Sequence, residues 1–417
     1  MVNVVDLDIT NVAHGGVFVA RHEGRVVFVP DSMPGERIRA RITDQKHDSF
    51  WRAEALEVLE ASPERQEHIW LAASIERAPE ERAGGAEFGH IRPAHQRELK
   101  RQVLADALQR MAKVESDVTV EPVSGETADG TGWRTRMRLQ VDRDGSFGPY
   151  AARSHNVVSV DDFPLATDLV QETVPFGQTF PGAESIDVVV TSGGAAHILV
   201  NEAPVKRGKR LVRPRHRPMP IREAVGDREF RLDVRGFWQV HRRAAAVLTE
   251  AVQSAVDEAM FDPRAANLDL YGGVGLLAAA LGDRFGSTLR ITSVESDEAA
   301  TDNAAENLAE WLGASALTDR VERFVSKLAA DASATDRSRL RAATVVLDPP
   351  RSGAGRPVVD ALASLEPAQI VYVACDPVAL ARDVALFAER GYALRSLRAF
   401  DLFPNTHHVE AVATLTR

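Results

Sequence analysis

The first sixty residues alternate between apolar and polar positions in runs too short for helices. The runs are "GGVFVAR", "GRVVFVP", "GERIRARITDQ" and "FWRAEALEVLE", with glycine or proline turns between them. A period of two is typical of strands with one buried face, and Gly and Pro supply the turns. The pattern predicts a small β-barrel of about five strands over residues 1–61, either oligonucleotide-binding or SH3-like.

The pattern is less regular in residues 62–235. The stretch "EFGHIRPAHQRELKRQVLADALQRMAK" has helical periodicity and predicts a helix near 93–113 that packs on the C-terminal part of the chain. Candidate strands follow it as far as "AAHILVNEAP". We expect a mixed α/β central region that binds RNA.

Strands and helices alternate in residues 236–417, which predicts an α/β, Rossmann-like sheet wound on both faces. The segment "AANLDLYGGVGLLAAAL" is a strand, a glycine turn and a helix, and "ITSVESD" ends the next strand at Glu295. Gly272, Gly273 and Gly275 allow a tight turn close to a ligand, and Glu295 can accept hydrogen bonds from ribose hydroxyls.

This glycine turn lacks the third glycine of the GxGxxG spacing, because "YGGVG" is followed by two leucines. The missing glycine disfavours a dinucleotide and favours S-adenosylmethionine. A turn that only packs the helix on its strand is the alternative without a ligand.

Three chemically active residues follow the ends of later strands. Asp348 opens "DPPR" after an apolar strand, Cys375 ends "AQIVYVAC", and Glu410 precedes the last strand. Because ligands bind outside the carboxyl ends of parallel strands, we expect these side chains on one rim. A thiolate that adds to carbon 6 of uracil activates carbon 5 toward an electrophilic methyl group, and a carboxylate can remove the carbon 5 proton. The alternative for Cys375 is a small buried apolar residue.

Composition limits the remaining classes. A single cysteine excludes a disulfide within the chain and any four-thiolate metal site. No segment resembles a signal peptide or a membrane span, so we expect a soluble cytoplasmic protein, for which a monomer is plausible.

Basic residues gather in two places although the net charge is −10. Residues 205–243 contain 13 Lys or Arg against 4 Asp or Glu, and the candidate strand "WRTRMRLQVDR" places Arg134, Arg136 and Arg138 on one face. Both suggest RNA contacts, to which Arg213, Arg215 and Arg217 contribute, whereas a solvated linker would also explain the first stretch.

Several motifs together resemble the RNA uracil-5 methyltransferase family, which makes 5-methyluridine in tRNA and 23S rRNA. They are "LDLYGGVG", "VESD", "VVLDPPRSG", "VYVACDPVALARD" and "LFPNTHHVE", in the family's order. The N-terminal "HGGVFVARHEGRVVFVPDSMPGERIRARI" resembles a TRAM domain, an RNA-binding barrel. The resemblance implies a catalytic domain at 236–417 that uses S-adenosylmethionine.

The resemblance also assigns roles to residues. It makes Cys375 the nucleophile on carbon 6 and Glu410 the base at carbon 5. The positions that it implies for contact with S-adenosylmethionine are Gln239, Tyr271, Gly273, Glu295 and Asp348.

Two positions depart from the family. Many members with a barrel hold an iron–sulfur cluster with a Cys-Gly-Gly-Cys segment, where this chain has Ala83 and Ala86 around Gly84 and Gly85. We therefore expect no cluster and no other metal. His241 stands where the family commonly has asparagine.

The barrel favours 23S rRNA as the substrate by resemblance alone. A tRNA methyltransferase, a methyltransferase for DNA or a small molecule, and a non-catalytic RNA-binding protein remain alternatives.

Overall fold

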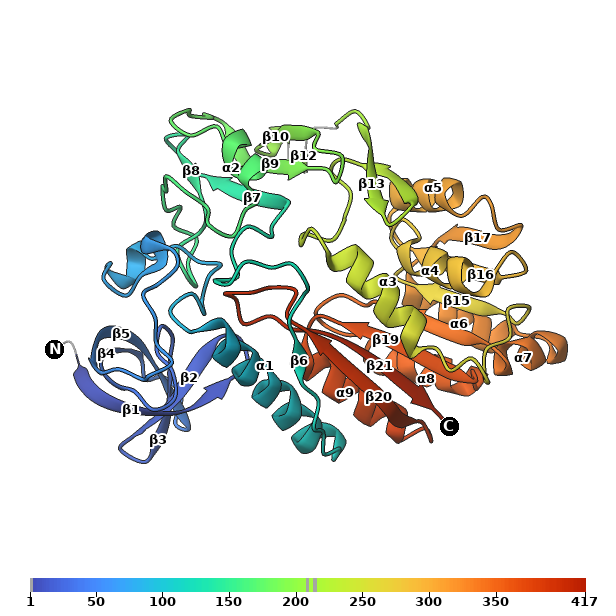
Figure 1. The fold of residues 1–417 in the computed structure, drawn as a ribbon, viewed down its shortest axis with the longest axis horizontal. Helices are drawn as coiled ribbons and strands as arrows, with labels where there is room; N and C mark the ends of the chain where they lie inside the picture. Colours follow the sequence, from blue (N-terminus) through green and yellow to red (C-terminus); the bar gives the residue numbers. More distant parts are fainter. Residues whose placement is uncertain (1–2, 208–209, 213–215) are drawn as a thin grey trace.

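The computed structural model describes residues 3–207, 210–212 and 216–417. An N-terminal barrel, a central antiparallel sheet and a C-terminal α/β unit follow each other along the chain, and helix α1 (Pro93–Ala107) lies between the barrel and the C-terminal unit (Figure 1).

The N-terminal strands close into a barrel in the order β1-β2-β3-β5-β4, which confirms the predicted fold of this unit. Its strands are β1 (Val4–Ala13), β2 (Val17–His22), β3 (Arg25–Val29), β4 (Arg37–Asp44) and β5 (Phe50–Glu60). The alternating apolar side chains form the barrel core, which Phe88 and Leu99 complete from outside the barrel strands. The segment that follows the barrel is therefore attached to the barrel through the barrel core.

The central region is built on an antiparallel sheet of order β10-β9-β7-β8. Its strands are β7 (Arg136–Val141), β8 (Phe147–Gly148), β9 (Ala183–Val190) and β10 (Ala196–Glu202), joined by helix α2 (Asp168–Thr173). Two hairpins follow, β11 (Val205–Arg207) with β12 (Arg210–Val212) and β13 (Pro220–Val225) with β14 (Arg228–Asp233). The short helices η1 (Leu71–Ala73) and η2 (Pro79–Glu81) precede α1, and the π-helical turn η3 (Leu108–Ala112) continues it.

The C-terminal unit contains an eight-stranded sheet of order β17-β16-β15-β18-β19-β21-β20-β6. Its strands are β6 (Val120–Glu121), β15 (Asn267–Leu270), β16 (Arg290–Glu295), β17 (Gly313–Thr318), β18 (Thr344–Leu347), β19 (Gln369–Ala374), β20 (Ala393–Phe400) and β21 (Glu410–Thr416). The run from β17 to β19 is parallel, and β21 is antiparallel to both neighbours. This confirms the Rossmann-like expectation.

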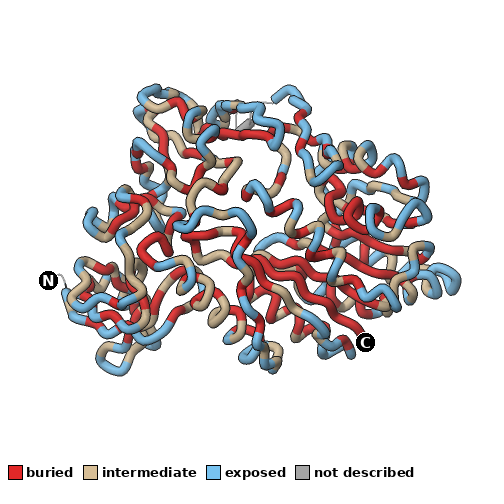
Figure 2. Tube along the Cα trace, in the orientation of Figure 1, coloured by how far each residue is buried: buried red, intermediate tan, exposed pale blue. Residues whose placement is uncertain are grey.

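Helices cover both faces of this sheet, and the buried strands between them form the largest core (Figure 2). One face packs against α3 (Ala244–Ala255), α4 (Leu276–Phe285) and the end of α5 (Glu298–Asn307). The other face packs against α6 (Val321–Asp331), α7 (Ala334–Arg341), α8 (Gly355–Leu365) and α9 (Pro377–Ala388). Strands buried on both faces explain the continuous apolar runs of the sequence.

The central region also contributes to the C-terminal unit. Strand β6 pairs in parallel with β20 at the edge of the large sheet. Helix α1 is bonded to the loop before β21: Lys100 Nζ donates to Asp401 Oδ1 (2.5 Å), and Gln96 Nε2 donates to Asn405 Oδ1 (2.8 Å). The loop that leads to Glu410 is thus held by residues far away in the sequence.

Candidate active site

The ends of three adjacent strands bring Asp348, Cys375 and Glu410 together. Asp348 follows β18, Cys375 follows β19, and Glu410 begins β21. Strand β19 pairs with both of the other strands, and Ala374 is opposite Ala411 in the antiparallel ladder. One step further along that register sets Cys375 beside Glu410, on the rim that the sequence predicts.

Burial and mutual repulsion raise the pKa of each of these groups and favour its protonated form. Burial raises the pKa of Asp348 to about 7, and the nearby Asp269 carboxylate adds to the effect. Burial followed by the charge of Asp348 raises the pKa of Glu410 well above its usual value. The pKa of Cys375 rises to about 12, first through burial and then through Glu410 and Asp348. The resting thiol is therefore neutral.

Arg351 is the cation that opposes these shifts. Its charge lowers the pKa of both Glu410 and Cys375. Its Nη2 donates to His408 Nε2 at 3.2 Å, and because a guanidinium can only donate, that histidine nitrogen must accept. Burial lowers the pKa of His408 to about 3, so a neutral imidazole orients Arg351 beside the rim.

A pocket next to the rim contains four of the five predicted cofactor residues. Gln239, Tyr271, Gly273 and Asp348 line it together with Trp238 and other apolar side chains. The fifth residue, Glu295, adjoins the pocket, because its Oε2 accepts a hydrogen bond from the Gly273 backbone N–H (3.3 Å). Its Oε1 accepts from the N–H groups of Ser296 and Asp297, which fixes the carboxylate at the end of β16.

The glycines of the turn have different functions. A Cβ on Gly272 would lie 2.0 Å from Ser293 Oγ and 2.6 Å from Asp269 Oδ2, so this glycine lets β15 and β16 approach. Gly273 has a φ of +53° and open space where a Cβ would be. Of the two, only Gly273 leaves room for a ligand.

Asp269 is a functional candidate that the sequence reasoning did not single out. It is fully buried in β15, burial raises its pKa to about 6, and its Oδ2 accepts from Ser293 Oγ (2.9 Å). Its Oδ1 has no hydrogen-bond partner among the described residues. An aspartate inside the apolar run "NLDL" was the signal in the sequence, because carboxylates are rarely buried without a reason.

The barrel also reaches the rim, which no pattern in the sequence indicated. His14 Nε2 lies 2.8 Å from Oδ2 of Asp376, the residue after Cys375. Asp376 Oδ1 meanwhile accepts from the N–H groups of Val378 and Ala379 and caps helix α9. Asp376 therefore contacts the barrel through His14, caps helix α9 and lies next to the thiol of Cys375.

Two of the three arginines expected on a basic strand are paired internally. Arg136 is buried and bonded to Glu223 Oε1 (2.8 Å), so its expected place on an RNA-binding face is wrong. Arg138 is exposed, but it donates twice to Asp187 (2.6 and 2.9 Å). Only Arg134, just before β7, lacks such an acid among the described residues.

The basic stretch 205–243 is also partly neutralised by ion pairs. Arg222 pairs with Glu229 (2.8 Å), Arg228 with Asp283 and Glu310, and Arg231 with Glu306. Arg217 is exposed, whereas Arg213 and Arg215 lie outside the described residues. An RNA contact by this stretch stays a prediction.

The segment around Gly84 and Gly85, in which the sequence departs from the expected Cys-Gly-Gly-Cys pattern, is a packed loop. Ala83 and Ala86 are buried in the apolar cluster that contains Trp70 and Phe163. Methyl groups provide no metal ligand, so the residues present do not fit an iron–sulfur cluster. Among the described residues no group of three or more His, Cys, Asp or Glu side chains is placed to hold a metal ion.

His241, the second departure from the family, has a packing role. It is buried and stacked on Trp133, with ring centroids 5.6 Å apart. Its Nδ1 accepts from the Arg243 N–H (3.0 Å), and its Nε2 faces Glu126 at 3.4 Å. It thereby attaches the segment that carries Gln239 to the central region.

No helix in the described parts of the chain has the length and apolar character that crossing a membrane requires.

Comparisons with known sequences agree with this geometry. Residues 224–417 match the family described as tRNA (uracil-5-)-methyltransferase, and residues 2–56 match the TRAM domain. A Streptomyces avermitilis protein described as an RNA methyltransferase is 37% identical over 98% of this chain and 97% of its own length. One from Corynebacterium diphtheriae is 33% identical over 100% of this chain and 97% of its own length. The predicted family and TRAM domain are confirmed.

A solved structure shares the whole fold. The Pyrococcus abyssi tRNA (uracil-54, C5)-methyltransferase, determined with S-adenosyl-L-homocysteine, aligns with a TM-score of 0.69 over 98% of this chain and 100% of its own. At 20% identity this likeness concerns the fold alone.

Proposed function

We propose that this chain, which belongs to the RNA uracil-5 methyltransferase family, transfers a methyl group from S-adenosylmethionine to carbon 5 of a uridine in RNA. The observation that carries the proposal is the meeting of Cys375, Glu410 and Asp348 at adjacent strand ends, beside a pocket built on a glycine turn. A nucleophile, a carboxylate and a cofactor pocket on one rim are the parts that this chemistry needs.

The pocket fits S-adenosylmethionine by the chemistry of its lining. The Tyr271 hydroxyl has no hydrogen-bond partner among the described residues, and Gly273 leaves open space above the turn. Glu295 would accept from ribose hydroxyls, while Gln239 and Asp348 would contact the polar end of the cofactor. When bound there, the cofactor supplies an electrophilic methyl group.

The residues of the rim would then act in sequence. After losing its proton to solvent, Cys375 Sγ bonds to carbon 6 of the target uracil, and the electron pair of the C5=C6 bond moves to carbon 5. Carbon 5 would then bond to the methyl carbon, while the bond from that carbon to the sulfonium sulfur of the donor would break and leave its electron pair on the sulfur. Glu410 removes the proton from carbon 5, the double bond re-forms, and the C6–S bond breaks to release the thiolate.

The charges of the rim set when the thiolate can form. Because burial, Glu410 and Asp348 raise the pKa of Cys375 to about 12, the free enzyme holds a thiol. Arg351 stabilises the thiolate, and its hydrogen bond to His408 keeps it in place. We infer that the thiolate forms while the two carboxyls are protonated, because a neutral acid does not repel the sulfur charge, and that Glu410 loses its proton before it removes the proton from carbon 5.

We propose 23S rRNA as the substrate, on the resemblance of the barrel to TRAM domains of enzymes that act on rRNA. A tRNA is the second candidate, because the Pyrococcus abyssi structure that aligns over 98% of this chain is that of an enzyme for uracil 54 of tRNA. In either RNA the target base must leave its stack to reach the thiol.

RNA that contains 5-fluorouracil tests the mechanism. Transcripts of 23S rRNA and of tRNAs are incubated with protein and S-adenosylmethionine, and stable complexes are separated on denaturing gels. Because fluorine cannot leave carbon 5 as a proton does, the covalent adduct should accumulate with the substrate transcript and with wild-type protein. Cys375→Ala should give none.

The control for this test is Glu410→Gln with ordinary uridine, which should trap the methylated adduct because the carbon 5 proton stays in place. A wild-type protein that binds both RNA and cofactor yet forms no adduct with any fluorinated transcript would contradict the covalent mechanism and favour a non-catalytic RNA-binding protein.

A further inference from the structure

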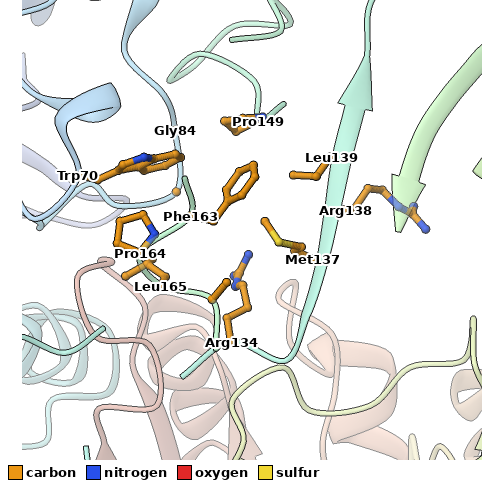
Figure 3. Close-up of a pocket in the computed structure, with 12 residues that line it drawn as sticks. Trp70, Gly84, Arg134, Met137, Arg138, Leu139, Pro149, Phe163, Pro164 and Leu165 are labelled. Atoms are coloured by element: carbon orange, nitrogen blue, oxygen red, sulfur yellow. The ribbon is translucent and has the colours of Figure 1, made fainter. Parts of the chain in front are cut away.

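A second pocket lies in the central region, outside the cofactor site, between the loop at Gly84 and strand β7 (Figure 3). Its walls are mainly apolar, with Trp70, Phe163, Met137 and Pro149 among the lining residues. The space within the pocket and at its mouth amounts to about 440 Å³. This volume includes space open to solvent, so the pocket is a surface recess and not an enclosed cavity.

Arg134 brings an unpaired charge to this apolar pocket. Its Nε is buried without a hydrogen-bond partner, and its guanidinium carbon lies 5.2 Å from the centroid of the Trp133 ring. No acid lies within ion-pair distance of it among the described residues. In Figure 3 the side chain points toward Phe163 and Met137. Burial lowers the pKa of Arg134 although the charge of Glu87 partly offsets the effect, so the folded chain holds this cation at a cost that a ligand with acceptor atoms would relieve.

Arg138 shows what a structurally satisfied arginine looks like in the same region. It stands two residues further along, donates twice to Asp187, and extends away from the other labelled side chains in Figure 3. Both arginines line the pocket, and of the two only Arg134 has no acid within ion-pair distance among the described residues.

The pocket is connected to the proposed active site. The Arg134 N–H donates to Leu165 O (2.8 Å), and the next residue, Thr135, donates through its N–H to Val240 O (2.8 Å), beside Gln239. The charge of Arg351 also contributes to the lowered pKa of Arg134. A single RNA segment could therefore reach both places.

The chemistry of the pocket walls indicates which part of an RNA, a phosphate or a base, the pocket could bind. A phosphate is strongly hydrated and gains nothing from apolar walls, whereas an unstacked base buries its two faces on aromatic and aliphatic side chains and leaves its edge for hydrogen bonds. A guanidinium has only donors, and its fork matches the O6 and N7 acceptors of guanine.

We propose that this pocket binds a second, unstacked nucleobase of the substrate RNA, a guanine, which stacks near Phe163 and accepts hydrogen bonds from Arg134 through O6 and N7. The proposal rests on the proposed function, since it assumes an RNA substrate. It adds a recognition site that fixes which uridine reaches Cys375.

Arg134→Met tests the proposal, with Arg138→Met as the matched control that removes one positive charge from the same region. The probe is the 23S rRNA or tRNA transcript that wild-type protein methylates, and its Kd is measured at several salt concentrations. Arg134→Met should weaken binding roughly 10- to 100-fold, the range of one bidentate base contact, without changing the slope of log Kd against log salt. Its melting temperature should be equal or higher, because an unpaired buried cation is gone.

The same transcript made with 7-deazaguanosine identifies the base contact. This analogue pairs like guanosine but lacks the N7 acceptor, so wild-type protein should bind it more weakly, whereas Arg134→Met should bind both transcripts equally. An affinity loss with a salt slope smaller by about one would identify a phosphate contact instead and overturn the proposal. Equal affinity of Arg134→Met and wild-type protein would overturn it too.

The two proposals fail in different ways. If wild-type protein forms 5-methyluridine in no transcript, the proposed function is wrong. If methylation proceeds and Arg134→Met binds and methylates RNA like the wild type, only the second base site is wrong. Binding of S-adenosylmethionine, followed by calorimetry, should be the same in all variants.

Discussion

Two buried polar regions lie on either side of the loop that precedes β21, and they differ in how their polar groups are satisfied. On the side of helix α1, Asn405 uses every hydrogen-bonding group that it has: its backbone and Oδ1 bond with Gln96 and Phe88, and its Nδ2 donates to the carbonyls of Asp129 and Gly130. On the rim, Glu410 and Asp348 lie close together, and the pKa of each carboxyl is raised.

This difference distinguishes buried polar groups that hold the fold together, called scaffold here, from those that belong to the proposed active site. A buried polar group that is fully bonded within the chain stabilises one arrangement of it, whereas a buried group that lacks partners destabilises the fold until a ligand supplies them. Lys100 belongs to the first kind, with acceptors at Asp401 Oδ1 and Phe403 O. Tyr271 belongs to the second, because its hydroxyl lacks a partner among the described residues.

The largest effect on the rim should come from Cys375→Ala, which is expected to abolish methyl transfer. Without the sulfur nothing adds to carbon 6, and carbon 5 does not become nucleophilic. The change removes one partly exposed atom, so the melting temperature should stay close to that of the wild type. Transfer of radioactive methyl to RNA measures the activity. Methyl transfer by this variant above background would contradict the assignment of the nucleophile.

The largest effect on the scaffold should come from Lys100→Met. Removing Lys100 leaves Asp401 with only Arg97, whose Nη1 lies 3.9 Å from Asp401 Oδ2, so the free energy of unfolding should fall by about 3 kcal/mol, the lower end of the range for a broken buried pair. Urea denaturation measures the change.

Two variants sharpen this result. Lys100→Met with Asp401→Leu should recover much of the loss, since a pair replaced by apolar residues leaves no buried charge. Arg101→Met, which removes an exposed ion pair with Glu98 on the same helix, should change the free energy of unfolding by less than about 1 kcal/mol. A small effect of Lys100→Met would mean that the pair does not hold the loop.

The barrel, the Rossmann-like sheet and the rim could be predicted from the sequence because each has a local signal. Alternation marks the barrel strands, and parallel strands have their carboxyl ends on one edge, which places Asp348 and Cys375 together. The roles of Cys375 and Glu410 came from family resemblance and stay proposals.

Contacts between distant segments could not be predicted. Strand β6 has two residues, too few for any periodicity, and it pairs with β20. The bond between His14 and Asp376 joins two surfaces that have no common pattern in the sequence. The expectation for Arg136 was wrong because alternation gives the face of a side chain but not the acid, here Glu223, that meets it.

Asp348→Asn should raise the free energy of unfolding while impairing the proposed function, as expected for a buried polar group that destabilises the fold in the absence of a ligand. The folded pKa of about 7 lies above the unfolded value of about 3.9, so the folded state binds the proton more tightly. Wild-type stability should therefore fall as pH rises from about 4 to 7 and stay constant above. The variant lacks this loss, and at pH 8 it should be more stable than the wild type by about 1–2 kcal/mol, after allowance for the partial exposure of Asp348.

Urea denaturation at pH 5 and pH 8 measures this difference, and Asp302→Asn, an exposed change on α5, is the control that should show none. The free energy of unfolding of Asp348→Asn should exceed that of the wild type by more at pH 8 than at pH 5. An equal difference at both pH values would mean that the surroundings do not destabilise the ionised carboxyl, and Asp348 would then not differ from the scaffold residues in this respect.

The smallest effect should come from His14→Ala, which removes the contact between the barrel and the residue after Cys375. Asp376 raises the pKa of His14 by accepting its hydrogen bond, so the stabilisation is complete below the ordinary histidine pKa of about 6.5 and is lost as pH rises through the raised value. Because His14 is half-exposed, the loss should be at most about 1 kcal/mol at pH 6 and smaller at pH 9, as measured by urea denaturation. Equal losses at both pH values would show that His14 contributes by packing, and that the barrel meets the rim without an ion pair.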